Sequence, residues 1–220
     1  MGGAWAVIVA AGRGERFGSA KQFEPLGGKP LYRWSLEAFD RHEEVEGIVL
    51  VVPPGPAGPL PSPRGKLKAV VAGGAERQDS VRSGFSRVPA EGSIVVLVHD
   101  GARPLVSGEL IGRVIAAARE RGAAVPGLSV EDTIKEVYGG RVLRTVDRSS
   151  LVRVQTPQGF LHSVLREALE LAAAQKFTGT DEAMLVERTG RTVALVEGDP
   201  KNIKVTTHWD IKVLEALIHE

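Results

Sequence analysis

Short apolar runs alternate with amphipathic segments along most of this chain. The apolar runs are rich in Val, Ile, Leu and Ala, which is typical of strands buried in a sheet. Strand-like runs lie at residues 4–10, 45–52, 66–73, 93–100, 123–128, 192–198 and 202–206. Apolar residues recur at helical spacing at residues 30–42, 76–88, 107–122, 160–175, 180–190 and 207–220. Ser107 and Thr180 are the candidate N-cap residues of two of these helices.

This alternation predicts an α/β protein with one open, mostly parallel, twisted sheet of Rossmann-like type and helices on both faces. We interpret residues 1–220 as a single domain, because a chain of this length can bury a sizeable core. In such sheets, ligands bind beyond the carboxyl ends of the strands. Three loops at predicted carboxyl ends, 10–22, 73–80 and 99–104, are therefore expected to meet at one site.

Residues 129–152 depart from the alternation. Two runs of alternating side chains, TIKEV and RVLRTV, flank the sequence YGG, which predicts a β-hairpin with a glycine-containing turn. Both runs carry polar residues, so neither face is an obvious core face. Such a hairpin either lies exposed or packs on another chain.

Charge and composition narrow the classes of function. A formal net charge of +1 argues against nucleic-acid or membrane binding by bulk charge. The absence of cysteine excludes disulfides, thiolate catalysis and cysteine-bound zinc. Neither a membrane-length apolar stretch nor a signal peptide is recognisable, so we expect a cytoplasmic protein. The scarcity of Asn, Met and Cys favours a thermophilic source, with compositional drift as the alternative.

The loop at 10–22 follows the first apolar run and reads AAGRGERFGSAKQ. Gly12 and Gly14 let the backbone approach a ligand and direct its N–H groups at phosphate oxygens. Arg16 and Lys21 add positive charge, which suits a triphosphate attacked at its α-phosphorus. The alternative is an ordinary glycine-rich turn with solvated basic residues.

Two further motifs end predicted strands. In GGAERQDSV, the backbone at Gly73 and Gly74 is a candidate for reading a base edge, and a simple turn before a helix is the alternative. In VHDGARP, Asp100 suits a Mg²⁺ ligand beside phosphates and Arg103 suits an anion clamp, whereas a turn residue is the alternative for Asp100. His99 is expected to pack or hydrogen-bond rather than to catalyse.

No pattern for a nucleophilic triad or a close carboxylate pair stands out, which favours catalysis by orientation and electrostatics. The motifs AAGRGERF, KQF, GGAERQDSV, VHDGARP, EDTIK, VDRSSL, QTPQ, GTDEA and NIKVT follow one another along the chain. Together they resemble the 2-C-methyl-D-erythritol 4-phosphate cytidylyltransferase family, from about Ala10 to Leu217. The resemblance implies a nucleotidyltransferase of non-mevalonate isoprenoid biosynthesis. It also implies that the phosphate of methylerythritol 4-phosphate attacks the α-phosphorus of CTP directly, with Mg²⁺, and releases pyrophosphate.

The same resemblance implies roles for individual residues. Arg16, Lys21 and Lys204 would stabilise the pentacoordinate phosphorus, and Asp100 would face the metal. CTP would be held by Ala10, Ala11, Gly12, Gly14, Gly74, Ser80 and Gly101. The acceptor would be contacted by Arg103, Thr133, Arg148, Thr156 and Thr180. The hairpin resembles an arm that interlocks two subunits of a homodimer, so Thr133 and Arg148 would reach the partner's site.

Three positions depart from the family pattern: Ala20 where Pro is usual, Ala75 where an acidic residue is common, and Gly101 where Ala is usual. Three alternatives stay open. A related cytidylyltransferase would act on another polyol phosphate, such as ribitol 5-phosphate. A glycosyltransferase domain would bind a nucleotide sugar, but the single Asp of VHDGARP counts against it. A non-catalytic scaffold would not need cations in its phosphate loops.

Overall fold

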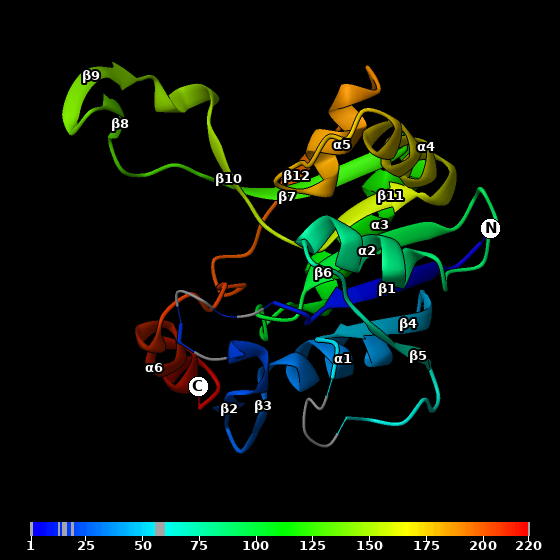
Figure 1. Ribbon diagram of the computed structural model, residues 1–220. Coiled ribbons are helices and arrows are strands. Elements are labelled where there is room, and N and C mark those ends of the chain that lie inside the picture. Colours follow the sequence, from blue (N-terminus) through cyan, green and yellow to red (C-terminus); the bar gives the residue numbers. More distant parts are fainter. Residues whose placement is uncertain (1, 13, 15–16, 19, 56–59, 220) are drawn as a thin grey trace.

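The computed structural model describes residues 2–12, 14, 17–18, 20–55 and 60–219. Arg16 therefore lies outside the described residues. Within them an eight-stranded sheet runs in the order β10-β7-β11-β6-β1-β4-β5, and β12 also pairs with β7 (Figure 1). The strands of this sheet are β1 Ala4–Val9, β4 Val45–Val52, β5 Leu67–Ala72, β6 Val95–Asp100, β7 Ala123–Ser129, β10 Val152–Val154, β11 Gln158–Leu161 and β12 Ala194–Glu197.

The centre of the sheet is parallel. β1 pairs in parallel with both β4 and β6, and β4 pairs in parallel with β5. Parallel strands covered on both faces read as continuous apolar runs, because neither set of alternating side chains meets water. The buried valines and leucines of β4 and β6 follow this rule, and the predicted strands at 45–52 and 93–100 are confirmed.

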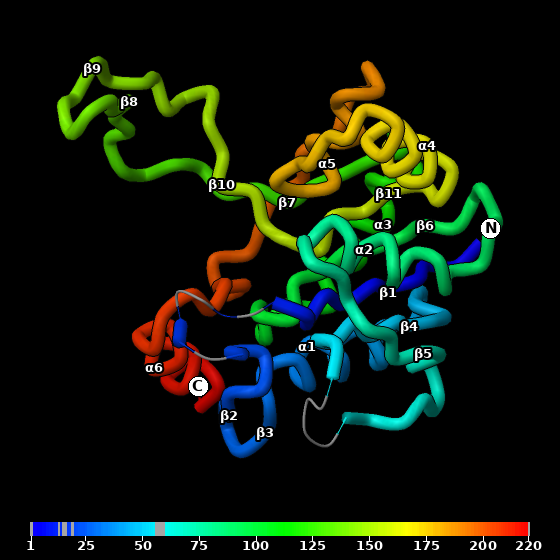
Figure 2. Tube along the Cα trace, viewed as in Figure 1, coloured from blue at the N-terminus to red at the C-terminus, as the bar shows by residue number. Residues whose placement is uncertain are grey.

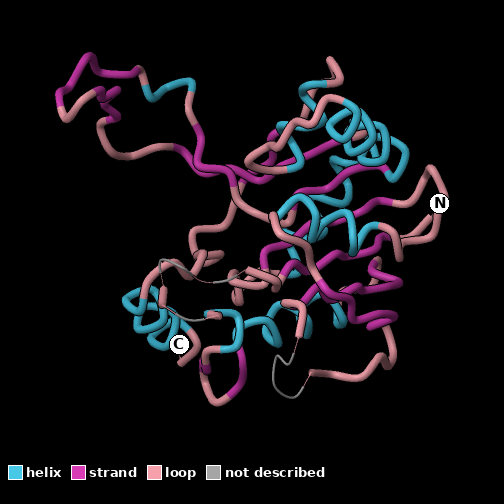
Figure 3. Tube along the Cα trace, viewed as in Figure 1, coloured by secondary structure: helices cyan, strands magenta, loops and turns pink. Residues whose placement is uncertain are grey.

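Helices cover both faces of the sheet, as predicted (Figure 3). On one face, α1 and α3 pack against side chains such as Ile8 and Leu97. On the other, α2, α4 and α5 pack against Val7 and Val98. The helices of these layers are α1 Leu31–Arg41, α2 Arg77–Phe85, α3 Gly108–Arg121, α4 His162–Ala174 and α5 Glu182–Arg188. Ser107 caps α3, since its Oγ accepts from the Leu110 N–H at 3.3 Å.

A third apolar cluster lies beside the main sheet. It joins Phe17 of the first loop to Leu26, Leu31, Val205 and Leu214. The last helix, α6 His208–Leu217, packs here beside the short strands β2 Pro25–Leu26 and β3 Lys29–Pro30 (Figure 2). The cluster therefore anchors the chain within and after the first glycine loop and just after Lys204.

Three local predictions are wrong. The segment 202–206 is not a strand: Val205 N–H donates to the Ala102 carbonyl at 2.8 Å, but no ladder forms. Thr180 does not cap α5, because Asp181 takes that place and accepts from the Met184 N–H at 2.9 Å. The sequence Gln158–Leu161, interpreted partly as helix and otherwise unassigned, is the antiparallel strand β11 between β6 and β7.

The predicted hairpin is confirmed and extends away from the sheet (Figure 1). Its strands are β8 Ile134–Tyr138 and β9 Arg141–Val146, joined by Gly139 and Gly140, both at positive φ. A short 3₁₀ helix, η2 Arg148–Ser150, follows. The apolar side chains of the hairpin are exposed, Tyr138 by 80% and Leu143 by 60%. Nothing within the described chain covers this hairpin, which we call the arm (residues 129–152).

Candidate active site

A cavity of about 400 Å³ opens at the carboxyl ends of β1, β4, β5 and β6. The predicted meeting of the three loops is confirmed, because each contributes to the lining of this cavity. Its lining includes Ala10, Ala11, Gly12, Lys21, Gln22, Gly74, Ala75, Glu76, Arg77, Ser80, Asp100 and Lys204. Eight of the predicted site residues lie in this set: Ala10, Ala11, Gly12, Lys21, Gly74, Ser80, Asp100 and Lys204.

The first glycine loop leaves the end of β1 and is tied back to the cavity by Gln22. The Gln22 side-chain Nε2 donates to the Gly12 carbonyl at 3.0 Å. A Cβ at Gly12 would meet nothing within 4 Å, so the backbone is bare there. Gly14 has φ +67°, a conformation that favours glycine. Lys21 begins the 3₁₀ helix η1 Lys21–Phe23, which fixes its backbone at the rim.

The second turn needs glycine for a different reason, close packing. A Cβ at Gly73 would lie 2.5 Å from the Ala11 Cβ and 2.6 Å from the Ser80 Oγ, so the first two loops touch here. Ser80 Oγ accepts from the Gly74 N–H and donates to the Glu76 carbonyl, both at 3.2 Å. A reciprocal capping box between Glu76 and Asp79 fixes the start of α2. The turn is therefore held open and rigid beside the cavity.

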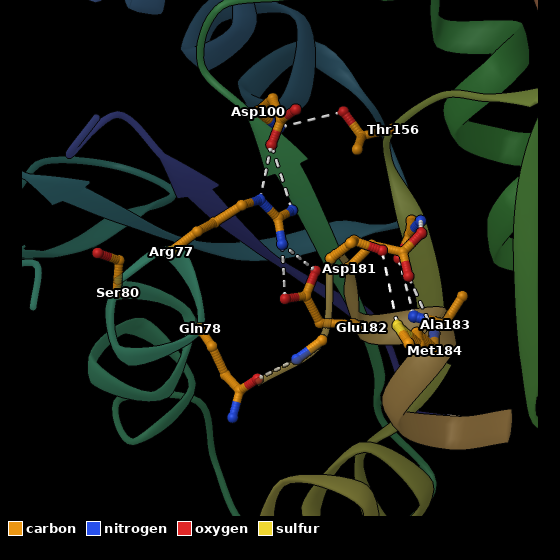
Figure 4. Close-up of polar contacts among 12 residues, drawn as sticks. Arg77, Gln78, Ser80, Asp100, Thr156, Asp181, Glu182, Ala183 and Met184 are labelled. Atoms are coloured by element: carbon orange, nitrogen blue, oxygen red, sulfur yellow. Dashed lines mark hydrogen bonds and ion pairs between the residues drawn. The ribbon is translucent and has the colours of Figure 1, made fainter. Parts of the chain in front are cut away.

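Asp100 lies at the tip of β6 between two cations (Figure 4 shows its contact with Arg77). Its Oδ1 accepts from the Nε and Nη2 of Arg77, each at 3.2 Å, and its Oδ2 lies 2.6 Å from the Nζ of Lys204. Burial would raise the pKa of Asp100, but Arg77 and Lys204 outweigh it and hold that pKa far below its usual range. Asp100 is therefore a carboxylate throughout the physiological pH range.

Arg77 also contacts a second acid, Glu182, at the start of α5 (Figure 4). Its Nη1 lies 2.7 Å and 2.8 Å from the two carboxylate oxygens of Glu182, a residue that is 1% exposed. Burial raises the pKa of Glu182, and Arg77 only partly offsets this. The two acids shift in opposite directions because Asp100 has two cationic partners and is less buried.

His99 lies beneath Asp100 and is fully buried. Its Nε2 lies 3.1 Å from the Arg103 carbonyl and its Nδ1 3.1 Å from the Thr156 Oγ1. Thr156 Oγ1 also accepts from the Asp100 N–H at 3.1 Å. Burial lowers the pKa of His99 to about 4, so the ring is neutral at pH 7. The prediction that His99 packs and hydrogen-bonds is confirmed.

Comparison with known proteins shows which family has this sequence and fold. The sequence model of the family described as "IspD: 2-C-methyl-D-erythritol 4-phosphate cytidylyltransferase" matches residues 4–220. The chain belongs to this family. The enzyme of that name from Geobacillus thermodenitrificans is 46% identical, over 97% of this chain and 96% of the relative. The one from Geobacter metallireducens is 43% identical, over 98% and 97%. The crystal structure of the Thermus thermophilus protein superposes with a TM-score of 0.83 at 39% identity and covers both chains fully.

Four other predicted site residues lie close to the cavity lining without belonging to it. Gly101 N–H donates to the Val9 carbonyl at 2.9 Å, and a Cβ there would lie 3.1 Å from the Ala10 Cβ. Arg103 is buried, and its Nη1 donates to the Asn202 carbonyl at 2.7 Å. Thr156 is buried under Asp100, and Gly14 lies further along the first loop.

The remaining three predicted residues lie apart or at the border of the site. Thr133 and Arg148 are exposed on the arm. Thr180 is exposed just before α5, with its hydroxyl 3.7 Å from the Met184 Sδ. Within one described chain, the structure therefore does not bring Thr133 and Arg148 to the cavity.

Sequence reasoning missed four residues of the site: Gln22, Arg77, Glu182 and Asn202. All four lie inside quoted motifs beside assigned residues: Gln22 in KQF, Arg77 in GGAERQDSV, Glu182 in GTDEA and Asn202 in NIKVT. Asn202 is fully buried, and its Nδ2 donates to the Thr156 carbonyl at 2.7 Å. The pairing of Arg77 with Glu182 spans 105 positions, so no local pattern indicates it.

Proposed function

We propose that this protein transfers the CMP moiety of CTP to 2-C-methyl-D-erythritol 4-phosphate, giving 4-diphosphocytidyl-2-C-methyl-D-erythritol and pyrophosphate. The observation that carries the proposal is the match to the family along nearly the whole chain, together with a cavity lined by both Lys21 and Lys204. A phosphate oxygen of the acceptor attacks the α-phosphorus, and the bond to the bridging oxygen of the leaving pyrophosphate breaks. No covalent enzyme intermediate is needed.

The chain's contribution to this step is orientation and positive charge. Lys21 and Lys204, with Arg16 from outside the described residues, would stabilise the negative charge that develops around the α-phosphorus. The first glycine loop would hold the phosphates through backbone N–H groups. The nucleotide would be held by Ala10, Ala11, Gly12, Gly14, Gly74, Ser80 and Gly101.

A magnesium ion fits this cavity as an ion carried mainly by the nucleotide. Among the described residues, no group of three or more His, Asp or Glu side chains lies together as a metal site. Mg²⁺ in nucleotide enzymes commonly takes one or two carboxylates, and its other ligands are phosphate oxygens and water. Asp100, ionised and lining the cavity, would supply such a carboxylate while it stays in contact with Arg77 and Lys204. The ion would offset triphosphate charge when bound.

The acceptor side is proposed to include Arg103, Thr156 and Thr180 from this chain and Thr133 and Arg148 from the arm of a second copy. The exposed apolar side chains of the arm support a homodimer, since such surface is covered in stable assemblies. No helix among the described residues is long and apolar enough to cross a membrane. A cytoplasmic location and a thermophilic source remain part of the proposal.

The test is pyrophosphate release with CTP and Mg²⁺, comparing methylerythritol 4-phosphate with ribitol 5-phosphate. Release with methylerythritol 4-phosphate is expected to exceed release with ribitol 5-phosphate by at least about a hundredfold in kcat/KM, because polar groups shaped for one polyol are left unpaired by the other. Preference for ribitol 5-phosphate would retain the nucleotide site and overturn the acceptor assignment.

A further inference from the structure

Arg77 joins parts of the cavity that come from distant stretches of the chain. It is the first residue of α2, directly after the turn that carries Gly74. Its guanidinium contacts Asp100 at the tip of β6 and Glu182 at the start of α5 (Figure 4). One side chain therefore connects the turn on the nucleotide side with two other elements of the site.

The neighbouring side chain, Gln78, also connects the start of α2 with the segment before α5. Its Nε2 donates to the Phe177 carbonyl at 3.1 Å, and its Oε1 accepts from the Gly179 N–H at 3.0 Å. The start of α2 is thus fixed against the segment that leads into α5. Gln78 alone provides this attachment without any charge, so attachment does not explain why an Arg–Glu pair lies beside it.

Glu182 is costly as a purely structural residue. A carboxylate that is 1% exposed loses its hydration, and an apolar side chain of similar size would fill the same space without that cost. Glu182 itself is too buried to contact a ligand in the cavity. What its charge adds is the orientation of Arg77, because both carboxylate oxygens accept from the same Nη1.

The orientation matters because of the shape of a guanidinium. With Nη1 held by Glu182, the Nε and Nη2 edge faces Oδ1 of Asp100. The other oxygen, Oδ2, then faces Lys204. A lysine at position 77 would carry the charge but could not present two fixed donor edges at once.

Building on the proposed function, we propose that Arg77 is a positioning residue for the transfer reaction: held by the buried Glu182, its guanidinium fixes the carboxylate of Asp100 and, through it, the ammonium group of Lys204. Glu182 acts on the reaction only through Arg77. Lys204 is then already placed when the phosphates arrive, and less orientation is lost in the transition state.

The experiment is a double-mutant cycle on the full chain with the substitutions Arg77→Lys and Glu182→Gln. Pyrophosphate release gives kcat and the KM for each substrate, calorimetry gives the CTP Kd, and thermal unfolding gives Tm. Glu182→Gln is expected to lower kcat about tenfold and Arg77→Lys about thirtyfold, with the CTP Kd within about threefold of wild type. The double variant should lose about thirtyfold rather than the product of the two losses, because Glu182 acts through Arg77.

Two matched variants separate positioning from stability. Glu182→Asp keeps the charge and should recover part of the kcat lost in Glu182→Gln. Glu167→Gln breaks another Arg–Glu pair, with Arg191 at 2.8 Å on the surface, and should leave kcat unchanged. If Glu182→Gln does not fold, Arg77→Lys alone tests the positioning role. A lower kcat with an almost unchanged CTP Kd supports that role.

The opposite results are equally distinct. A Glu182→Gln variant with a lower Tm but wild-type kcat would make the pair structural only. Multiplying losses in the double variant would show that Glu182 acts independently of Arg77. A large rise in the CTP Kd for Arg77→Lys would make Arg77 a direct ligand contact. If wild type turns over only ribitol 5-phosphate, the same cycle is run with that acceptor, and a wild type inactive with both acceptors overturns the proposed function and this proposal together.

Discussion

The strands β6 and β9 both contain a Val–Leu pair, and the two pairs meet opposite surroundings. In β6, Val96 and Leu97 are fully buried between two layers of helices. In β9, Val142 and Leu143 are about 60% exposed on the arm. The centre of the sheet therefore packs within the chain, whereas the arm does not. Similar local sequence therefore forms a buried core strand in one case and an exposed apolar surface in the other.

Deleting Glu136–Val146 from the arm tests this contrast most strongly. We expect complete conversion of the proposed dimer to monomer, because the exposed apolar surface of the arm is removed, while the sheet stays folded. Sedimentation velocity measures the first effect and circular dichroism the second. A truncated protein that still sediments as a dimer would show that another surface joins the copies.

The substitutions Leu97→Ala and Leu143→Ala compare the two strands directly. Leu97→Ala should lower the free energy of unfolding by about 2–5 kcal/mol, because it leaves a cavity between packed layers. Leu143→Ala should change it by less than about 0.5 kcal/mol in dilute protein, where the proposed dimer would dissociate. Urea unfolding at several protein concentrations measures both. If both substitutions lower the free energy of unfolding equally at low protein concentration, the arm is packed within its own chain.

Lys21→Ala changes the cavity and leaves the arm intact. It should lower kcat by about a hundredfold, with a much smaller rise in the KM for CTP, because the contact proposed for Lys21 with the phosphates would strengthen in the transition state. Steady-state pyrophosphate release gives both constants. A large KM effect with normal kcat would instead assign Lys21 to ground-state binding, and sedimentation should show an unchanged dimer.

Acidification should weaken the sheet through His99. Its pKa is lowered from 6.5 to about 4 in the folded chain, so the unfolded state binds the proton first as the pH falls. The free energy of unfolding contributed by the neutral His99 ring is therefore fully present above pH 6.5. It is lost between pH 6.5 and about 4, by up to about 3 kcal/mol. Urea unfolding at pH 7 and pH 4.5 measures this loss. His99→Phe should reduce the dependence on pH; an unchanged dependence would assign it to other groups.

The sequence predicts the parts of the fold that depend on local patterns. β1, β4 and β6 are recognisable because burial on both faces leaves continuous apolar runs. β11 is not, since its four residues contain Gly159 and lead directly into α4. The segment around Lys204 alternates like a strand, yet among the described residues the bond from the Val205 N–H to the Ala102 carbonyl is not extended into a ladder.

The same distinction applies to the site. Glycine loops at strand ends are visible in the sequence because turn chemistry is local, and their convergence follows from the topology of parallel sheets. The Arg77–Glu182 contact and the contact of His99 with Thr156 join residues that are distant along the chain, so only the folded structure shows them. The contacts proposed for Thr133 and Arg148 need a second copy.

The most direct test of the account mixes two inactive variants, Lys21→Ala and Arg148→Ala. If the arm of one copy completes the cavity of the other, each mixed dimer contains one intact site, built from an intact cavity and an intact partner arm. Random exchange at equal concentrations should then restore about a quarter of wild-type pyrophosphate release. No recovery, although sedimentation or labelled subunits show that mixed dimers form, would contradict the claim that the arm serves the partner's site.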